Sequence, residues 1–288
     1  MKLLIILLAW IIEHFAGIAD NMRRLDWFSR YVRALENRCN RYPFWQGPAG
    51  VIITLGGPVV LVALLVWILL KLFYPMAVVV SLVLLLYSLG PGYLNTRLDD
   101  YIQALEKGDL PRIQQLGAEF SPLVEGSIQS EQNLLEGILV YANHRLFGVL
   151  FWFMVLGPCG AVWYRLTAAL AQEYREIRGG YADSVRDLSN ILDWPASRLF
   201  ALGNALTGNM VVALEAWREV EQRSLAVNED VIRASGLGAL SYQPSGAETG
   251  QLLEDRIYWL RALQGMLNRT LLVWLTGLGL MTLAGWLG

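Results

Sequence analysis

Eight polar side chains stand at the edges of apolar segments, where they could act on a ligand: Glu13, Asp20, Asn143, Arg145, Arg165, Asp187, Asp193 and Arg198. Arginine binds carboxylate and phosphate groups through its planar fork of N–H donors, and carboxylate and amide oxygens bind cations or polar substrates. Each side chain also has a structural interpretation, because arginines beside a span reach toward the membrane surface and nearby carboxylates pair with them. Our hypothesis is that the eight line one interfacial ligand-binding pocket.

Other familiar catalytic or metal-binding motifs are missing from the sequence. There is no G-x-x-x-x-G-K-[ST] phosphate loop, no G-x-S-x-G and no H-E-x-x-H. Cys39 and Cys159 lack the number and spacing of a disulfide framework or a metal site, so both are interpreted as free thiols. His14 and His144 are too far apart in sequence to suggest a zinc cluster and are interpreted as polar surface or interfacial side chains. The sequence therefore predicts no metal and assigns no catalytic residue.

The composition places these side chains in a membrane protein. Of 288 residues, 55% are hydrophobic and only 17% are charged, which is typical of a chain with several membrane spans. The balance of 23 Lys and Arg against 25 Asp and Glu lacks the positive field of a nucleic-acid-binding protein. Neither strand alternation nor an internal repeat is evident. We predict an all-α, polytopic integral membrane protein with amphipathic or interfacial helices and a helical cytoplasmic part.

Long uncharged runs set the expected order of elements. Residues 51–70 form the first span, 76–93 the second span of a hairpin, and 270–287 the last span. A further run, 146–171, is interrupted by Gly157-Pro158-Cys159-Gly160, so it is either one kinked span or a re-entrant hairpin turning at that tetrapeptide. The predicted divisions are 1–50 (apolar and basic amphipathic helices), 51–93 (transmembrane hairpin), 94–145 (aqueous helices), 146–171 (membrane segment), 172–269 (aqueous or interfacial helices) and 270–288 (C-terminal span).

Charge distribution gives the expected orientation. Lys and Arg number six in 14–50, four in 94–145 and eleven in 165–269. Basic segments stay on the cytoplasmic side, so we expect these three segments on the cytoplasmic side of a bacterial inner membrane. The turn at 71–75 and the C-terminus should lie on the other side.

The N-terminal segment has two interpretations, since residues 1–12 followed by Gly17-Ile18-Ala19 resemble a cleavable signal peptide. Cleavage would export six arginines, which favours a retained helix lying along the membrane.

Periodicity places helices in the polar segments. Leu25, Phe28, Val32, Leu35 and Cys39 share one face of a basic amphipathic helix, which either attaches to anionic headgroups or another helix or packs under the protein's own spans.

Three further patterns give expectations for the aqueous part. A helix through Leu98 and Leu105 should end at Gly108-Asp109. The stripe from Tyr181 to Leu192 predicts a helix that stops near Leu192, and Pro195 should start a new one. The Gly- and Ser-rich stretch 235–250 predicts a loop.

Several short motifs, in this order, resemble the AmpE family of inner-membrane proteins associated with β-lactamase induction. They are Glu13, Asn143-His144-Arg145-Leu146-Phe147, Leu192-Asp193-Trp194-Pro195 with Arg198-Leu199, and Leu206-Thr207-Gly208 leading to Ala213 and Trp217. The resemblance implies a non-catalytic regulatory or sensor protein of cell-wall signalling. Its partners would be the lipid bilayer, a small anionic ligand, and the amidase AmpD or another signalling protein.

AmpE is in turn similar to the cobalamin-pathway enzyme that attaches an aminopropanol unit to a corrinoid using ATP. The matching motifs here are Gly157-Pro158-Cys159-Gly160-Ala161, Tyr164-Arg165 and Pro195-Ala196-Ser197-Arg198-Leu199. The enzyme's Glu-Asn pair and following Asp are replaced by Ala142-Asn143 and Leu146, which removes two polar groups. The alternative hypothesis is thus an ATP- and Mg-dependent membrane ligase, in which Asn143, Asp187 and Asp193 contact metal or phosphate and Arg165 and Arg198 contact anionic substrate.

Overall fold

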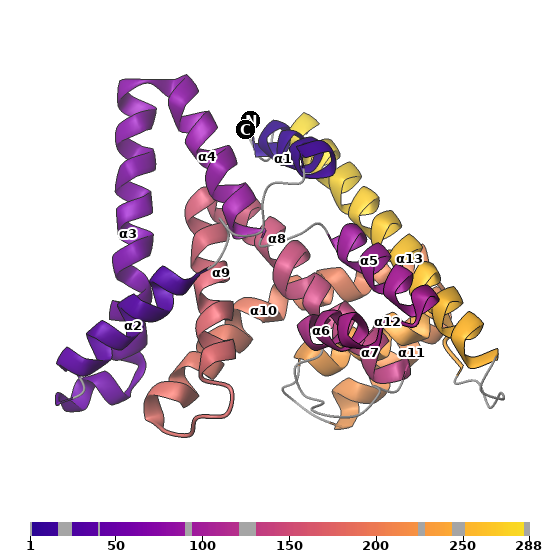
Figure 1. Cartoon of the computed structure of the whole chain (residues 1–288). Helices are drawn as coiled ribbons and strands as arrows, with labels where there is room; N and C mark the ends of the chain where they lie inside the picture. Colours follow the sequence, from indigo (N-terminus) through magenta and orange to yellow (C-terminus); the bar gives the residue numbers. More distant parts are fainter. Residues whose placement is uncertain are drawn as a thin grey trace. The chain divides into compact units, whose positions relative to one another are not determined.

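The computed structural model describes residues 2–16, 25–39, 41–89, 94–120, 131–223, 228–243 and 251–284, which form helices and short connections (Figure 1). The all-α prediction is confirmed, because no β-strand occurs within these ranges. The helices are α1 (Lys2–Ala16), α2 (Asp26–Cys39), η2 (Pro43–Gln46), α3 (Pro48–Leu72), α4 (Tyr74–Ser88), α5 (Leu94–Lys107), α6 (Leu110–Phe120), α7 (Glu131–Ala142), η3 (Asn143–Phe147), α8 (Gly148–Leu156), α9 (Pro158–Glu173), α10 (Gly180–Thr207), α11 (Met210–Arg223), α12 (Asn228–Leu240) and α13 (Gln251–Leu283).

The helices belong to two compact units made of discontinuous stretches. The first unit comprises Met1–Pro91, His144–Pro195 and Ala284–Gly288, and the second comprises Gly92–Asn143 and Ala196–Leu283. The chain passes from one unit to the other inside two continuous helical runs, at the start of η3 and after Pro195 of α10. Each unit is described separately below.

Three helical runs in the described part of the chain are long and apolar enough to cross a bilayer: Pro48–Leu72, Glu131–Leu156 and Leu253–Leu283. The helix α4 is also apolar but shorter, and it packs against α3 after a break at Phe73. Large side chains on α3 remain outside the protein core, with Leu61 69% and Trp67 60% exposed. Hydrocarbon accommodates such a surface, whereas water does not. The chain is therefore a membrane protein, and its number of crossings stays a prediction.

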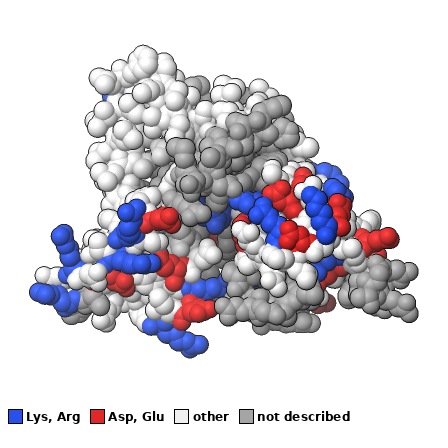
Figure 2. Space-filling model, in the orientation of Figure 1, with Lys and Arg blue, Asp and Glu red and all other residues white. Residues whose placement is uncertain are grey.

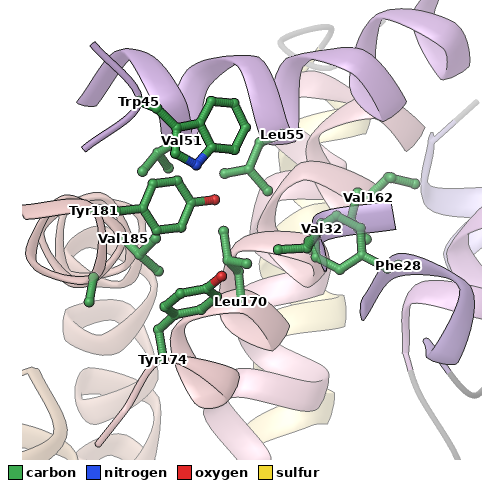
Figure 3. Packing of buried hydrophobic residues seen from close by; sticks show 12 residues of the cluster. Phe28, Val32, Trp45, Val51, Leu55, Val162, Leu170, Tyr174, Tyr181 and Val185 are labelled. Atoms are coloured by element: carbon green, nitrogen blue, oxygen red, sulfur yellow. The ribbon is translucent and has the colours of Figure 1, made fainter. Parts of the chain in front are cut away.

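The first unit holds a core in which α2, α3, α9 and α10 meet (Figure 3). Phe28 and Val32 of α2 are buried there, and the Trp45 ring stacks on the Tyr181 ring at 5.8 Å between centroids. The Tyr181 hydroxyl donates a hydrogen bond to Thr54 Oγ1 at 3.0 Å. The apolar face of α2 thus packs within the protein, as one of the two sequence interpretations had it, while its arginines face outward.

Figure 2 shows Lys and Arg gathered around α2 and the α9–α10 connection, and an almost uncharged surface over the tip of α3 and α4.

The apolar run 146–171 is broken into two helices that pack against each other. Gly157 has φ +70°, a conformation that glycine adopts without strain, and Pro158 starts α9. A Cβ on Gly160 would lie 2.2 Å from the Trp152 carbonyl oxygen, so glycine is needed for α8 and α9 to approach. The helices α8 and α9 contact each other on either side of the tetrapeptide, and the choice between a kinked span and a re-entrant hairpin stays a prediction.

Two predicted boundaries are wrong. The expected break before Pro195 does not occur, because α10 continues through Pro195 to Thr207. Pro195 has no N–H group to donate to the Ile191 carbonyl oxygen, so one helical hydrogen bond is lost. Packing against a neighbouring helix can compensate for this loss. The Trp152 indole donates to the adjacent Leu192 carbonyl oxygen at 3.0 Å. The predicted end of a helix at Gly108 is correct, with φ +67° at that glycine.

The second error concerns 235–250, where residues up to Leu240 belong to helix α12 and residues 244–250 lie outside the described part. The glycines of this stretch serve close packing. A Cβ on Gly236 would lie 2.4 Å from a Leu139 methyl group of α7, and one on Gly238 would lie 2.9 Å from the Ala213 Cα of α11. Small residues that look like loop formers in sequence are here helix-packing residues.

Candidate functional site

The sequence motif at 143–147 forms a π-helical turn, η3, in the middle of the long run from α7 to α8. Hydrogen bonding from residue i to i+5 is rare and mostly occurs as single turns at functional sites. The turn carries Asn143, His144 and Arg145 in succession. Asn143 is fully buried, whereas the side chain of His144 is 29% exposed.

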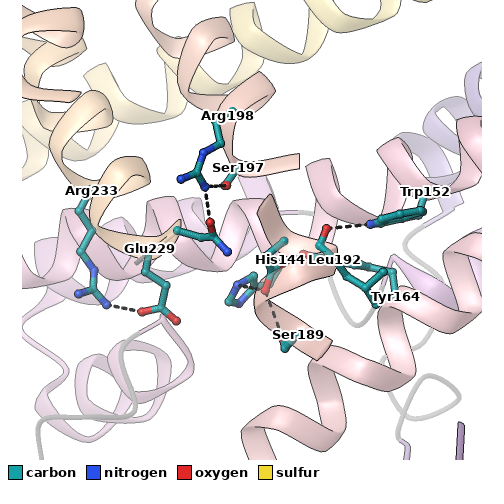
Figure 4. Close-up of polar contacts among 11 residues, drawn as sticks. His144, Trp152, Tyr164, Ser189, Leu192, Ser197, Arg198, Glu229 and Arg233 are labelled. Carbon is teal, nitrogen blue, oxygen red and sulfur yellow. Dashed lines mark hydrogen bonds and ion pairs between the residues drawn. The ribbon is translucent and has the colours of Figure 1, made fainter. Parts of the chain in front are cut away.

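Asp193 of α10 is the centre of a polar cluster in the first unit (Figure 4). Its side chain is only 7% exposed. The Tyr164 hydroxyl donates to Asp193 Oδ1 at 2.5 Å, and the Ser189 hydroxyl donates to Oδ2 at 3.2 Å. His144 Nε2 lies 3.6 Å from the same Oδ2. A buried carboxylate held by two hydroxyl donors remains a good partner for a positive charge on the imidazole.

The packing of α8 against α9 brings Tyr164 to this cluster. Gly148 lies directly opposite the Tyr164 ring, and a Cβ at Gly148 would be 2.3 Å from the phenol oxygen. Glycine at this position therefore makes room for the tyrosine. On the other side, the hydrogen bond from Trp152 to the Leu192 carbonyl ties α8 to the turn of α10 that carries Asp193. Both contacts come from α8 and α9 and orient groups around the carboxylate.

A second polar cluster, in the second unit, surrounds Arg198. The Arg198 guanidinium donates to the Ser197 hydroxyl at 3.2 Å and to the Asn228 side-chain oxygen of α12 (Figure 4). Burial lowers the pKa of Arg198, and the charge of Glu221 opposes this shift. Because an arginine pKa lies far above neutral, the guanidinium keeps its charge. Both acceptors are uncharged, and the cluster retains the chemistry to bind an anion.

Asn143, also in the second unit, has a buried amide that none of the described residues satisfies. Its side chain is 0% exposed, and neither its nitrogen nor its oxygen has a hydrogen-bond partner among the described residues. Leaving such a group unpaired costs about 1–3 kcal/mol. An amide kept at that cost, on a π-helical turn, is suited to a polar ligand.

The eight sequence candidates are divided between the two units, so the single pocket stays a prediction. Asp193 lies in the first cluster and Arg198 in the second. Arg165, which follows Tyr164 in the sequence, is buried. Arg145 is half-buried on η3. The Glu13 side chain and all of Asp20 lie outside the described residues.

Asp187 is exposed and lies six positions before Asp193, which places the two about 120° apart around α10. Two carboxylates that leave one helix in such different directions do not bind the same ion. Within the described ranges there is also no group of three His, Cys, Asp or Glu side chains that could hold a metal ion. These residues do not fit a protein-built magnesium site, whereas Arg198 and the Asn143 amide fit phosphate oxygens.

Sequence reasoning misses five members of these clusters: His144, Tyr164, Ser189, Ser197 and Asn228. The sequence offers Tyr164 and Ser197 only as parts of motifs, and it favours an interfacial role for His144. Ser189 is four residues before Asp193, a spacing that places both on one helix face and could have identified it. Nothing local in the sequence connects Asn228 to Arg198, since 30 positions separate them.

A model of the CobD/Cbib protein family matches residues 6–251 of the chain. The chain belongs to the CobD/Cbib family. The cobalamin biosynthesis protein CobD of Chromobacterium violaceum is 27% identical over 259 residues, which cover 83% of this chain and 80% of that protein. The protein of the same name from Stutzerimonas stutzeri is 30% identical over 175 residues, covering 58% of this chain and 57% of that protein. No solved structure shows significant similarity to the chain.

Membership in the CobD/Cbib family overturns one prediction. The chain is not the non-catalytic AmpE-type regulator of β-lactamase induction expected from its short motifs, because its relatives are cobalamin biosynthesis proteins. The motifs that misled the assignment are the ones that form the clusters: Asn143 to Phe147 builds the π-helical turn, and Asp193 accepts the hydrogen bonds of Tyr164 and Ser189.

Proposed function

We propose that this CobD/Cbib-family chain is an enzyme of cobalamin biosynthesis in the bacterial inner membrane that joins an amine, of the aminopropanol type, to a carboxyl group of a corrinoid using ATP. Two relatives are named cobalamin biosynthesis protein CobD, which supports this pathway. The single observation that carries a catalytic role is the buried cluster around Asp193, in which two hydroxyl donors and an imidazole converge on one carboxylate. Clusters of this kind inside an apolar helical protein are expensive to bury and commonly functional.

The chemistry explains why a nucleotide is needed. To form an amide from a carboxylate and an amine, one carboxylate oxygen must leave, and oxide is a very poor leaving group. ATP, when it is bound, supplies the chemistry that converts this oxygen into a better leaving group. The protein's part is to bind anionic oxygens, to orient the two reactants and to accept a proton. Arg198, held by Ser197 and Asn228, is placed to bind phosphate or carboxylate oxygens, and the Asn143 amide adds an uncharged donor and acceptor.

A direct assay with purified protein in detergent tests this function. The substrates are a corrinoid carboxylic acid, 1-amino-2-propanol and ATP, and mass spectrometry follows the gain of the amine with loss of water. We expect product only when all three are present. The Arg198→Gln variant should give at least about 10-fold less product, because one charge-assisted contact contributes about 1.5–3 kcal/mol. Folded wild-type protein that forms no product under any nucleotide condition would exclude the ligase.

A further inference from the structure

We propose that His144 is the general base of the ligation and that the buried Asp193 positions it. This inference rests on the proposed function and adds to it the residue that accepts the proton of the attacking amine. The juxtaposition that carries it is His144 Nε2 at 3.6 Å from Asp193 Oδ2, with Asp193 fixed from two other sides.

Asp193 is more buried than His144, as expected if the carboxylate orients the imidazole and the imidazole meets the substrate. The Asp193 side chain is 7% exposed, while that of His144 is 29% exposed. Tyr164 and Ser189 hold the carboxylate, so it cannot turn away from the imidazole without breaking a hydrogen bond. A carboxylate facing Nε2 favours the tautomer with hydrogen on that nitrogen, which leaves Nδ1 as the proton acceptor.

The backbone supports the same arrangement. His144 lies on the π-helical turn, whose i+5 bonding displaces its side chains from the positions that a continuous α-helix would give them. Asp193 lies one residue after Leu192, whose carbonyl oxygen is held by the Trp152 indole. The π-helical turn thus positions His144, and the hydrogen bond from Trp152 to the neighbouring Leu192 carbonyl oxygen helps to position Asp193.

The proposed step balances as follows. The amine nitrogen attacks the activated carboxyl carbon and a C–N bond forms. The C–O bond to the ATP-derived leaving group breaks, and that group departs with the electron pair. The proton lost by the nitrogen moves to Nδ1 of His144, and the charge of Asp193 stabilises the resulting imidazolium.

The other ionisable groups near the pair belong to the elements that pack around it. They are Arg145 on the turn itself, and Tyr164 and Arg165 on α9. Only Asp193 is within ion-pair distance of His144 among the described residues.

Two nucleophiles separate proton acceptance from carboxyl activation. Hydroxylamine is largely unprotonated at neutral pH and attacks an activated carboxyl group without an enzymatic base, releasing its proton to solvent, so ATP-dependent hydroxamate formation reports activation alone. Amide formation from 1-amino-2-propanol reports activation and deprotonation together. The variants are His144→Gln, with His144→Asn as a second replacement, and Asp193→Asn. The matched control is Asp183→Asn, an exposed carboxylate on the same helix, whose side chain is 59% exposed.

We expect His144→Gln to lose about 100-fold in amide formation, the usual scale of general base catalysis, and to keep hydroxamate formation within a few-fold of wild type. Asp193→Asn should lose part of the amide rate and keep hydroxamate formation, because His144 is present but no longer held by the carboxylate. The control Asp183→Asn should keep both rates.

Two results overturn the inference while leaving the ligase in place. One is full amide formation by both His144 variants, and the other is an equal loss of amide and hydroxamate by folded variants. A wild-type protein that forms no hydroxamate would instead overturn the proposed function, and this inference with it.

Discussion

At the scale of single residues, the described clusters depend on space as much as on hydrogen bonds. Tyr164 reaches Asp193 because residue 148 has no side chain, and the fully buried Asn143 amide has no hydrogen-bond partner in the described part of the chain. Neither feature is a consequence of hydrophobic burial alone. Each feature suggests one substitution, and the two substitutions should change stability and activity in different ways.

The first prediction concerns Gly148. Replacing it with alanine puts a methyl group 2.3 Å from the Tyr164 ring, so the ring must move away from Asp193. We expect a loss of about 1–3 kcal/mol in stability, the usual cost of overpacking, together with reduced ligase activity. Thermal unfolding in detergent measures the first effect. The control is Gly56→Ala on α3, where a Cβ meets nothing within 4 Å, and unchanged melting of Gly148→Ala would contradict the described packing.

The second prediction concerns Asn143. Replacement by leucine removes an unpaired buried amide and keeps a similar volume, so the protein should be as stable as wild type or more so while ligase activity is lost. Asn204 is the matched control, since it is equally buried but its oxygen accepts a hydrogen bond from Thr270 at 3.1 Å. Asn204→Leu should lower the melting temperature. A strongly destabilised Asn143→Leu would show that the amide has a structural partner.

At the scale of helices, glycines decide which elements touch. The helix α12 packs on α7 through Gly236 and on α11 through Gly238, and α8 approaches α9 at Gly160. The atom opposite each glycine determines the cost of replacing it. A flexible side chain can move aside, whereas a backbone atom cannot.

This difference gives the third prediction. Gly238→Ala should destabilise the protein more than Gly236→Ala, because its Cβ meets the Ala213 Cα and the Val212 carbonyl, whereas the other meets the end of the Leu139 side chain. The two variants have the same change in helix propensity, so a comparison of their melting temperatures isolates packing. Equal melting temperatures, or a lower one for Gly236→Ala, would contradict this assignment.

At the scale of the whole molecule, the open question is how the helices lie across the membrane. The short connection at Phe73 between α3 and α4 carries little charge, whereas the turn at Gly108 and Asp109 lies in a polar segment. The distribution of basic residues predicts opposite sides for the two turns.

The fourth prediction uses these turns. In a background with Cys39 and Cys159 replaced by serine, Phe73→Cys should react with a membrane-impermeant thiol reagent in intact cells, and Asp109→Cys should react only after permeabilisation. Both positions are exposed, so access across the membrane decides the labelling. Labelling of Asp109→Cys from outside would reverse the proposed orientation.

The sequence by itself determined the apolar runs, the all-helical fold and the helix end at Gly108, because these follow from local composition, periodicity and turn residues. It also contained the motifs of the two clusters, although their short patterns first favoured the wrong family function. Only the tertiary structure decided that α10 continues through Pro195, that 235–240 is helical, and that Asp187 is separate from Asp193. It also paired His144 with Asp193 and Arg198 with Asn228. Contacts between residues 30 or more positions apart depend on how helices pack, and no local pattern encodes that geometry.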